Sequence, residues 1–360
     1  MHNKAPSVTI NRPAAHRRTL GAAALLGALL LLAGCESPPP QRNSETELLL
    51  GTTIGVTTYG DVPDRVYSRV FDRVLEIEEK MSTSEEDYTM TELMAVNDAA
   101  GEMPIGVSED TFHVVAQAVD YSRLTDGAFD VSVQPLVSLW GIGTEWAAIP
   151  PEEEIEAAVA AIDYREVELD TDSQEIFLTG ADMGIDVGGI AKGYAADEAA
   201  RILREEGVES ALLDFGGNIQ TVGTKPDGSA WRIGIQVPDA TRGQYIGIAD
   251  VVDLAVVTSG TYERYFVEDG VRYHHILDTT TGYPVRNELD SVTIVTAESI
   301  RADALSTAVF AMGLEDGLAF VEGLADVEAL FVTTEHELIL TAGMDDYFEL
   351  TNEEYTRAER

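Results

Sequence analysis

The only cysteine of the chain, Cys35, directly follows its longest apolar run, 19-TLGAAALLGALLLLAG-34. With one cysteine the chain cannot form an intramolecular disulfide, so a hydrophobic core must hold its fold together. The sequence is 45% hydrophobic, which supplies enough material for a core and argues against a disordered chain. At 360 residues, one large domain or two ordinary ones are possible.

The segment around the cysteine has the order of a bacterial lipoprotein signal. Residues 1–18 carry four basic side chains and no acidic one, and the apolar run that follows ends in small residues before Cys35. We therefore expect removal of residues 1–34 as a signal peptide and lipidation of Cys35, for example with palmitate. The protein would then be exported and anchored to a bacterial membrane, on its periplasmic face or the cell exterior. A buried core cysteine is the disfavoured alternative.

Beyond the cysteine, residues 35–47 form a polar, proline-rich stretch that we interpret as a tether. We predict one compact or bilobed α+β domain at 48–345, with a mixed, largely antiparallel sheet and flanking helices, and an acidic tail at 346–360. Short strands should alternate with Gly, Asp and Pro turns between 211 and 277. Apolar spacing predicts a helix near 63–80. Cap and turn residues such as Ser108, Pro151 and Gly207 favour helices near 108–124, 152–161 and 192–206, and two more are expected near 299–312 and 315–324. Strands are expected near 48–59, 166–169, 175–179 and 290–297, with a hairpin near 328–341.

The charge of the chain limits its partners. There are 64 acidic and 23 basic residues, which gives a formal net charge of −41. Nucleic-acid binding requires basic surface, so we exclude it as a function. An acidic excess of this size favours solubility at high salt, where screening removes self-repulsion, and the sequence thus suggests adaptation to high ionic strength.

The segment 186-DVGGIAKGYAAD-197 is the first candidate site. It holds Lys192, one of only three lysines after residue 34. Its glycines let a ligand approach the backbone, the predicted helix start offers free N–H groups, and Lys192 adds a charge, which together suit phosphate. Asp186 can orient a hydroxyl or amine. The spacing matches neither a P-loop nor a dinucleotide fingerprint, so a plain strand–helix turn remains the alternative.

Three further segments carry candidate ligand-binding side chains. Asp303 and Thr307 are four residues apart on one helix face and offer hard oxygen ligands for Mg²⁺, although helix capping is the simpler interpretation. His275, in 273-YHHILDTTTG-282, could act as a general base or as a hydrogen-bond donor to phosphate, but it is also consistent with an ordinary strand histidine. Phe129, in 125-TDGAFDVSVQPLVSLWG-141, can stack on an aromatic ligand or fill the core.

Together, and in this order, these segments resemble the ApbE family of bacterial FAD:protein FMN transferases. The resemblance runs from about residue 50 to 313 and includes several long, unusual pieces. The other matching pieces are LGTT (50–53), MST (81–83), TELMAVN (91–97), LLDFGGNIQTVG (212–223), WRIGIQVP (231–238) and VTSGTYERYF (257–266).

The resemblance implies a T-fold-like ApbE domain and an Mg²⁺-dependent reaction. FMN would pass from FAD to a Thr or Ser hydroxyl of a partner protein through a phosphoester, with release of AMP. The implied acceptor segment is D-x-x-[ST]-G-A-[TS], in subunits of membrane electron-transfer complexes. The implied metal ligands are Asp303, Thr307 and the Gly189 carbonyl, and His275, Lys192 and Asp303 would be catalytic. The implied FAD contacts are Leu50, Asn97, Ala128, Phe129, Asp130, Asp186, Lys192 and Ile276.

Two other functions fit the same residues. Water in place of the protein hydroxyl would make the chain an Mg²⁺-dependent FAD pyrophosphatase that yields FMN and AMP. A flavin-binding lipoprotein without turnover is the alternative outside enzymes, although storage needs no metal. The sequence departs from the family pattern at Leu50, Ser84 and Thr279, where methionine, an aromatic residue and proline are common, and none of these changes removes a metal ligand.

Overall fold

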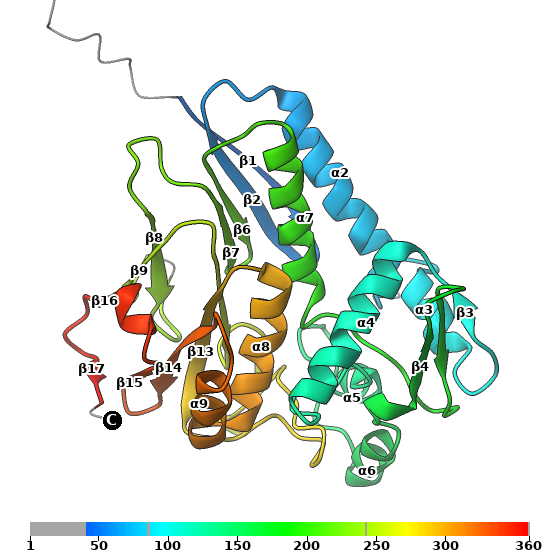
Figure 1. Cartoon of the computed structure of the whole chain (residues 1–360). Helices are drawn as coiled ribbons and strands as arrows, with labels where there is room; N and C mark the ends of the chain where they lie inside the picture. Colours follow the sequence, from blue (N-terminus) through cyan, green and yellow to red (C-terminus); the bar gives the residue numbers. More distant parts are fainter. Residues whose placement is uncertain (1–40, 85–86, 242, 359–360) are drawn as a thin grey trace, which may run out of the picture. The chain divides into compact units, whose positions relative to one another are not determined.

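The computed structural model describes residues 41–84, 87–241 and 243–358 (Figure 1). The predicted signal peptide and Cys35 lie outside these residues. None of the described helices combines the length and apolar character that a membrane span requires.

A central sheet organises the fold. Within the described residues it has nine strands in the order β1-β2-β6-β7-β10-β13-β14-β15-β17, all antiparallel except the β15–β17 pair. The strands are β1 (Arg42–Leu49), β2 (Thr52–Tyr59), β6 (Ala211–Phe215), β7 (Asn218–Val222), β10 (Ala255–Gly260), β13 (Leu289–Thr296), β14 (Glu328–Thr333), β15 (Glu337–Leu340) and β17 (Thr356–Arg357).

Helices α2, α7, α8 and α9 cover one face of this sheet (Figure 1). Helix α2 forms because apolar residues recur at helical spacing, with Val66, Val70, Val74 and Ile77 all buried. The helices are α2 (Asp64–Met81), α3 (Glu92–Asp98), α4 (Glu109–Leu124), α5 (Gln134–Trp140), α6 (Glu152–Ala160), α7 (Ala191–Glu205), α8 (Ser299–Met312) and α9 (Leu314–Glu322), with short 3₁₀ turns at Tyr164–Glu166 and Met344–Asp346.

A second sheet packs on the opposite face, so the central strands are buried on both sides. In β10, Val257 faces the core beneath α8, while its neighbour Val256 packs with residues of the second sheet. This double burial explains why seven of the eight residues of β13 are buried, polar ones included. The second sheet consists of β8 (Trp231–Gln236), β9 (Tyr245–Val251) and β16 (Phe348–Leu350).

Two smaller sheets complete the described chain. One contains β3 (Ile105–Gly106), β4 (Val167–Asp170) and β5 (Glu175–Leu178). The other is the hairpin of β11 (Tyr265–Glu268) and β12 (Val271–His274), which packs on Trp140 at the end of α5. The predicted α+β class with a largely antiparallel sheet is confirmed.

The boundaries of the folded part differ from the predicted 48–345. Strand β1 begins at Arg42 and pairs with β2 along its whole length, so residues 42–47 belong to the sheet rather than to a tether. The predicted acidic tail contains β16, paired with β9, and β17, paired with β15. These segments lack an apolar signature because β1 is a mostly exposed edge strand and the two C-terminal strands are very short.

Candidate active site

The glycine–lysine segment folds into a tight turn that leads into α7. The Gly188 N–H donates to Asp186 Oδ1 at 2.8 Å, and Lys192 Nζ donates to the Gly188 carbonyl at 3.2 Å. Thr83 Oγ1 donates to the other carboxylate oxygen of Asp186 at 3.2 Å. The turn therefore brings the predicted residues Asp186, Gly189 and Lys192 together at the start of one helix, as the sequence led us to expect.

Helices α7 and α8 approach each other closely at Gly193. A Cβ atom at this position would lie 2.4 Å from the Ser299 carbonyl oxygen, which real Cβ atoms do not tolerate. The Gly193 N–H donates to Asp303 Oδ2 at 2.9 Å. Glycine is thus required for the approach that places the Asp303 carboxylate against the first turn of α7.

Asp197, one turn farther along α7, caps the start of α8. Its two carboxylate oxygens accept from the N–H groups of Ser299 and Ile300, each at 2.9 Å. Residue Glu298, which precedes α8, gives no side-chain cap of its own. Burial raises the pKa of Asp197 to about 6, although both hydrogen bonds lower it.

Oxygen atoms gather where the turn meets α8. Asp303 is 3% exposed, and its Oδ1 lies 3.6 Å from Lys192 Nζ. A Cβ on Gly189 would be 3.8 Å from Thr307 Oγ1, so this hydroxyl faces the glycine turn. Ser259 Oγ lies 3.4 Å from Thr307 Oγ1.

This oxygen cluster fits a magnesium ion. A carboxylate and a hydroxyl are hard ligands, and Mg²⁺ accepts few protein ligands because it retains water and phosphate oxygens. Among the described residues, no group of three or more His, Cys, Asp or Glu side chains is arranged to hold a metal, and the cluster contains a single acid. It is thus unsuited to soft metals such as copper.

The loop at 128–130 forms one wall of the site. A Cβ on Gly189 would stand 3.0 Å from the ring of Phe129, so the aromatic ring lies directly against the glycine turn. Ala128 forms part of the turn, its N–H donating to Thr125 O. The carboxylate of Asp130 is buried and accepts from Ser132 N–H and Oγ, at 2.9 and 2.6 Å. Thr279 Oγ1 donates to Gly127 O at 3.2 Å, which links this loop to the segment that carries His275.

His275 is held at the base of the β11–β12 hairpin by Arg264. The Arg264 carbonyl accepts from the backbone N–H and from Nδ1 of His275, at 3.1 and 3.3 Å. A carbonyl can only accept, so Nδ1 carries the proton and Nε2 keeps its lone pair. Arg264 Nη2 lies 3.5 Å from the Gly51 carbonyl in the β1–β2 turn, where Leu50 has a positive φ of 52°. The predicted contact Leu50 therefore borders the same group.

The electrostatics of this group keep the imidazole neutral. Desolvation, together with the nearby charges of Arg264 and Lys192, holds the pKa of His275 well below its usual range. Desolvation and the Asp303 carboxylate raise the pKa of Glu263, while Lys192 lowers it. The site thus combines fixed positive charge with a neutral base.

Two predicted FAD contacts have their polar groups engaged with the protein. Asn97 Nδ2 donates to the Ile185 carbonyl at 3.0 Å, and its Oδ1 accepts from the Ile185 N–H at 2.8 Å. Ile276 is buried, and its backbone bonds to His274 Nδ1 and Val285 N. These contacts position the chain beside Asp186 and His275, and direct contacts with a flavin remain predictions.

Residue-by-residue reasoning on the sequence missed Ser259, Glu263, Arg264 and Asp197. Ser259, Glu263 and Arg264 lie in VTSGTYERYF, and Asp197 is the last residue of DVGGIAKGYAAD. The resemblance includes both motifs but assigns no role to these side chains. Their partners lie far away in the sequence, and only the two motifs themselves gave a signal.

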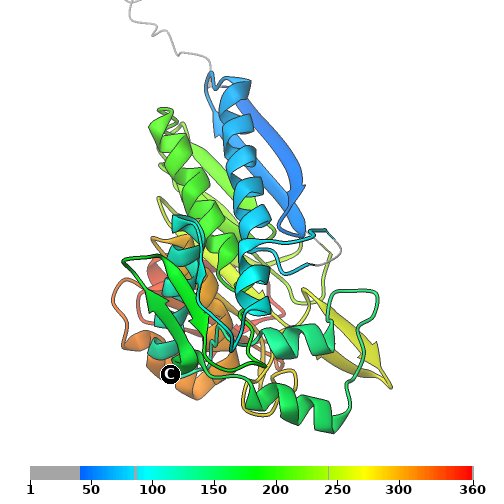
Figure 2. The ribbon, with the colours of Figure 1, turned by 90° about the vertical axis from the view of Figure 1, so that its right-hand side faces the viewer.

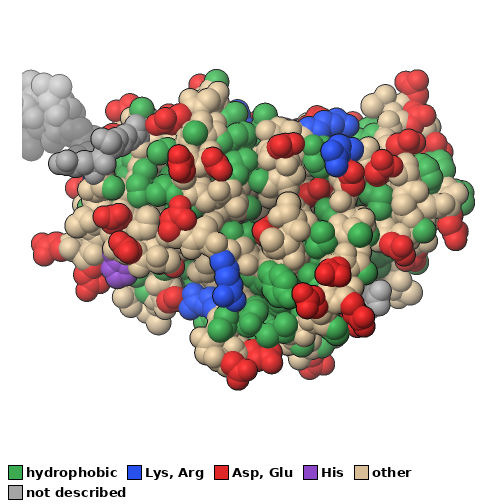
Figure 3. Space-filling view, turned by 90° about the horizontal axis from the view of Figure 1, so that it is seen from below, with side chains coloured by type: hydrophobic (Ala, Val, Ile, Leu, Met, Phe, Trp, Pro, Cys, Tyr) green, Lys and Arg blue, Asp and Glu red, His purple; other side chains and the backbone are tan. Residues whose placement is uncertain are grey.

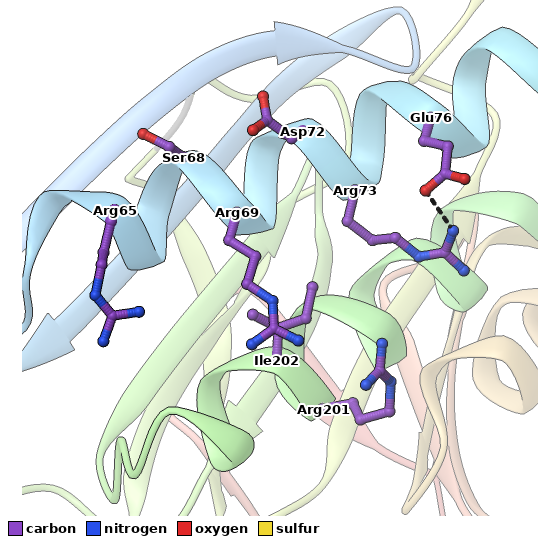
Figure 4. A pocket seen from close by; sticks show the side chains of 8 residues that line it. All are labelled: Arg65, Ser68, Arg69, Asp72, Arg73, Glu76, Arg201 and Ile202. Carbon is purple, nitrogen blue, oxygen red and sulfur yellow. Dashed lines mark hydrogen bonds and ion pairs between the residues drawn. The ribbon is translucent and has the colours of Figure 1, made fainter.

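An arginine-lined groove of about 490 Å³ between α2 and α7 is a separate feature (Figure 4). Its arginines are matched by carboxylates, with Arg69 bonded to Glu205 and Glu206 and Arg73 bonded to Asp110. We interpret it as a clamp between the two helices. The lining residues are Arg65, Ser68, Arg69, Asp72, Arg73, Glu76, Arg201 and Ile202, and none is a predicted site residue.

Comparison with known proteins identifies the family of the chain. The profile of the ApbE family matches residues 50–331. A FAD:protein FMN transferase from Klebsiella pneumoniae is 38% identical over 83% of this chain and 92% of its own length, and one from Vibrio cholerae is 38% identical over 82% and 89%. The crystal structure of the ApbE protein from Thermotoga maritima superposes with a TM-score of 0.79 at 32% identity, covering 85% of this chain and 99% of that one. The chain belongs to the ApbE family.

Proposed function

We propose that this protein is a transferase that moves FMN from FAD to a hydroxyl of a partner protein. The observation that carries the proposal is the meeting of Lys192, Asp303 and Thr307 at the start of α7, beside the ring of Phe129. A pyrophosphate and an aromatic ring system are what such a set of groups can hold together. The names of the relatives support the same activity.

Asp303, Thr307 and the carbonyl of Gly189 would hold a magnesium ion. Bound there, the ion would neutralise charge on the phosphates of FAD. Lys192 would bind the same pyrophosphate, since its ammonium group lies 3.6 Å from Asp303 Oδ1. In a chain of net charge −41, this local arrangement supplies the positive field that an anionic substrate needs.

His275 would accept the proton of the acceptor hydroxyl. Its Nδ1 donates to the Arg264 carbonyl, so Nε2 is the free acceptor. The hydroxyl oxygen attacks the phosphorus of the FMN half and forms a phosphoester, the bond from that phosphorus to the bridging oxygen breaks, and AMP leaves with the bridging oxygen. Binding of the phosphates would raise the pKa of His275 and improve it as a base.

We also propose that the protein acts outside the cytoplasm, anchored to a membrane through a lipid on Cys35. The basic, apolar and cysteine-terminated order of residues 1–35 supports this location. Acceptors would then be membrane proteins with a segment of the form D-x-x-[ST]-G-A-[TS], such as electron-transfer subunits.

The activity can be tested with FAD, Mg²⁺ and a carrier protein fused to a D-x-x-T-G-A-T segment. We expect a fluorescent carrier band on a denaturing gel and an equal amount of AMP. AMP and free FMN without a band would indicate FAD hydrolysis, and no AMP would indicate flavin storage.

Asp303→Ala removes the only carboxylate of the oxygen cluster. We expect it to lower the transfer rate by at least about 10²-fold, because the pyrophosphate charge is no longer neutralised by a bound metal. The control is Asp316→Ala, which removes an exposed acid from α9 and should leave the rate unchanged. Full flavinylation by the Asp303→Ala protein would refute the metal site.

A further inference from the structure

The hairpin of β11 and β12 continues outward from the proposed catalytic group. Its register pairs Phe266 with Tyr273, and extending it by one residue at each strand pairs Arg264 with His275. Side chains two residues apart along a strand share a face, so His275, Tyr273 and Phe266 lie on one side of the hairpin. That side packs on Trp140, whose ring stacks on Tyr273 with centroids 5.7 Å apart.

The other side of the hairpin packs on the protein at its base, where His274 lies edge-on to Phe310, while two of its apolar side chains are exposed. Tyr265 and Val267 lie on this side, and Val267 is 59% exposed. Figure 2 shows the hairpin, in yellow, beside the short helices α5 and α6. In the described residues it is a separate two-stranded sheet, so its strands have no further strand along their outer edges.

The loop after α5 adds apolar surface at the base of the hairpin. Trp146 is 53% exposed, and its ring lies against Gly141. A Cβ atom on Gly141 would be only 2.7 Å from that ring. A Cβ on Gly143 would lie 3.4 Å from Arg264 Cδ, which joins the loop to the hairpin base. We call the hairpin, the 141–149 loop and Arg286, which lies over the ring of Tyr273, the hairpin surface.

Basic side chains lie on the hairpin surface, although the chain as a whole is strongly acidic. Arg272 lies over the ring of Tyr265 at 4.4 Å, and Arg286 lies over Tyr273 at 5.8 Å. No carboxylate of the described residues pairs with Arg286, whereas Arg272 bonds to Asp239. The acids of the hairpin itself, Glu268 and Asp269, are at its turn, away from His275, and the 141–149 loop carries one exposed acid, Glu145. Figure 3 shows one face of the molecule on which basic side chains adjoin hydrophobic ones amid scattered acids.

We propose that the hairpin surface is where the acceptor protein docks, through an extended segment that carries apolar side chains and a carboxylate beside the modified hydroxyl. This inference rests on the proposed transfer reaction, since only a protein substrate must reach His275 from outside. Exposed Tyr and Trp supply large contact areas, the arginines attract the carboxylate, and an open strand edge accepts an extended chain. A flavin alone needs none of these features.

The test measures binding of the acceptor separately from turnover. The probe is a carrier protein fused to a D-x-x-A-G-A-T segment, which cannot be modified at the central position, in the presence of FAD and Mg²⁺. Val267→Glu and Arg286→Glu change opposite parts of the hairpin surface, and neither residue belongs to the proposed catalytic group. Met103→Glu is the matched control, because Met103 is 56% exposed and lies outside the hairpin surface.

We expect both hairpin variants to weaken carrier binding by at least about tenfold, which corresponds to the loss of one interface anchor. The control should bind the carrier as the wild type does, and all four proteins should quench FAD fluorescence with the same affinity. Circular dichroism checks that each variant is folded. If one variant fails to fold, the other still tests the proposal.

The result separates the two proposals. Wild-type affinity for the carrier in both variants, or no binding by the wild-type protein, would overturn the docking proposal. Binding of the carrier without AMP release from the unmodified D-x-x-T-G-A-T fusion would refute the transfer reaction and leave the docking surface standing.

Discussion

Two adjacent histidines hold opposite tautomers. His274 lies 2.8 Å through Nε2 from the Val285 carbonyl and accepts through Nδ1 from the Ile276 N–H at 3.3 Å, so both of its ring nitrogens are used. His275 donates through Nδ1 and keeps Nε2 free. Neighbouring residues of the same type thus have separate roles, because a main-chain carbonyl fixes the proton on a different nitrogen in each.

We expect His275→Asn to lower kcat for flavin transfer by about 10²–10⁴-fold, the usual contribution of a general base. Asparagine retains a donor near the position of Nδ1 but has no group at Nε2, so FAD affinity should change little. Steady-state kinetics and FAD titration check this. His336→Asn is the control, since that residue lies in the β14–β15 turn with a positive φ of 62°, which asparagine tolerates. An unchanged kcat would assign the proton to another group, with Glu263 the first candidate.

Among the elements, α7 and α8 determine each other's position. Helix α7 supplies the Gly193 N–H for Asp303 and the Asp197 carboxylate for the start of α8. Helix α8 supplies the carboxylate that pairs with Lys192. The proposed phosphate and metal groups therefore depend on one helix crossing, and a change at this crossing should alter both.

Gly193→Ala tests this dependence. The added Cβ would meet the Ser299 carbonyl at 2.4 Å, so the helices must separate. We expect a loss of about 1–3 kcal/mol in the free energy of unfolding, typical of overpacking, together with weaker Mg²⁺-dependent binding of FAD. Urea denaturation and FAD titration measure the two effects. Gly106→Ala should show neither, because a Cβ there meets nothing within 4 Å.

The cap on α8 predicts a specific pH dependence. The pKa of Asp197 is about 6 in the folded protein, above the 3.8 of an ordinary aspartate, so the folded state binds the extra proton between these values. The contribution of this residue to the free energy of unfolding should therefore decrease as the pH rises from about 4 to about 6. In urea unfolding at several pH values, Asp197→Asn should lack this decrease relative to the wild type. Parallel curves for the two proteins would show that Asp197 does not titrate in this range.

For the whole molecule, the sequence predicted those elements whose signal is local. The apolar spacing of α2 and the alternation of β13 depend on nearby residues, and both elements lie where expected. Strand β1 gave no such signal because it is a mostly exposed edge strand. The roles of Gly193 and Asp197 depend on α8, which follows about a hundred residues later, so spacing within their own motif could not reveal them.

The net charge of −41 makes stability dependent on salt. Like charges repel one another in the folded state, and salt screens this repulsion, so the melting temperature should rise with sodium chloride between about 0.01 and 1 M. Thermal unfolding followed by circular dichroism measures the change. Arginine–carboxylate pairs such as Arg69 with Glu206 oppose the trend, because salt weakens exposed ion pairs. A constant or falling melting temperature would show that these pairs dominate.

The candidate site is built from four segments: the β1–β2 turn at Gly51, the start of α7, the hairpin base at Arg264, and α8 at Thr307. These segments are made at very different times during synthesis, and Thr307 emerges after most of the chain. A growing chain therefore has no flavin site, and a chain exported before folding carries no FAD with it. Such a protein must obtain its flavin in the compartment where it folds, so the proposed export would make its activity depend on a supply of FAD outside the cytoplasm.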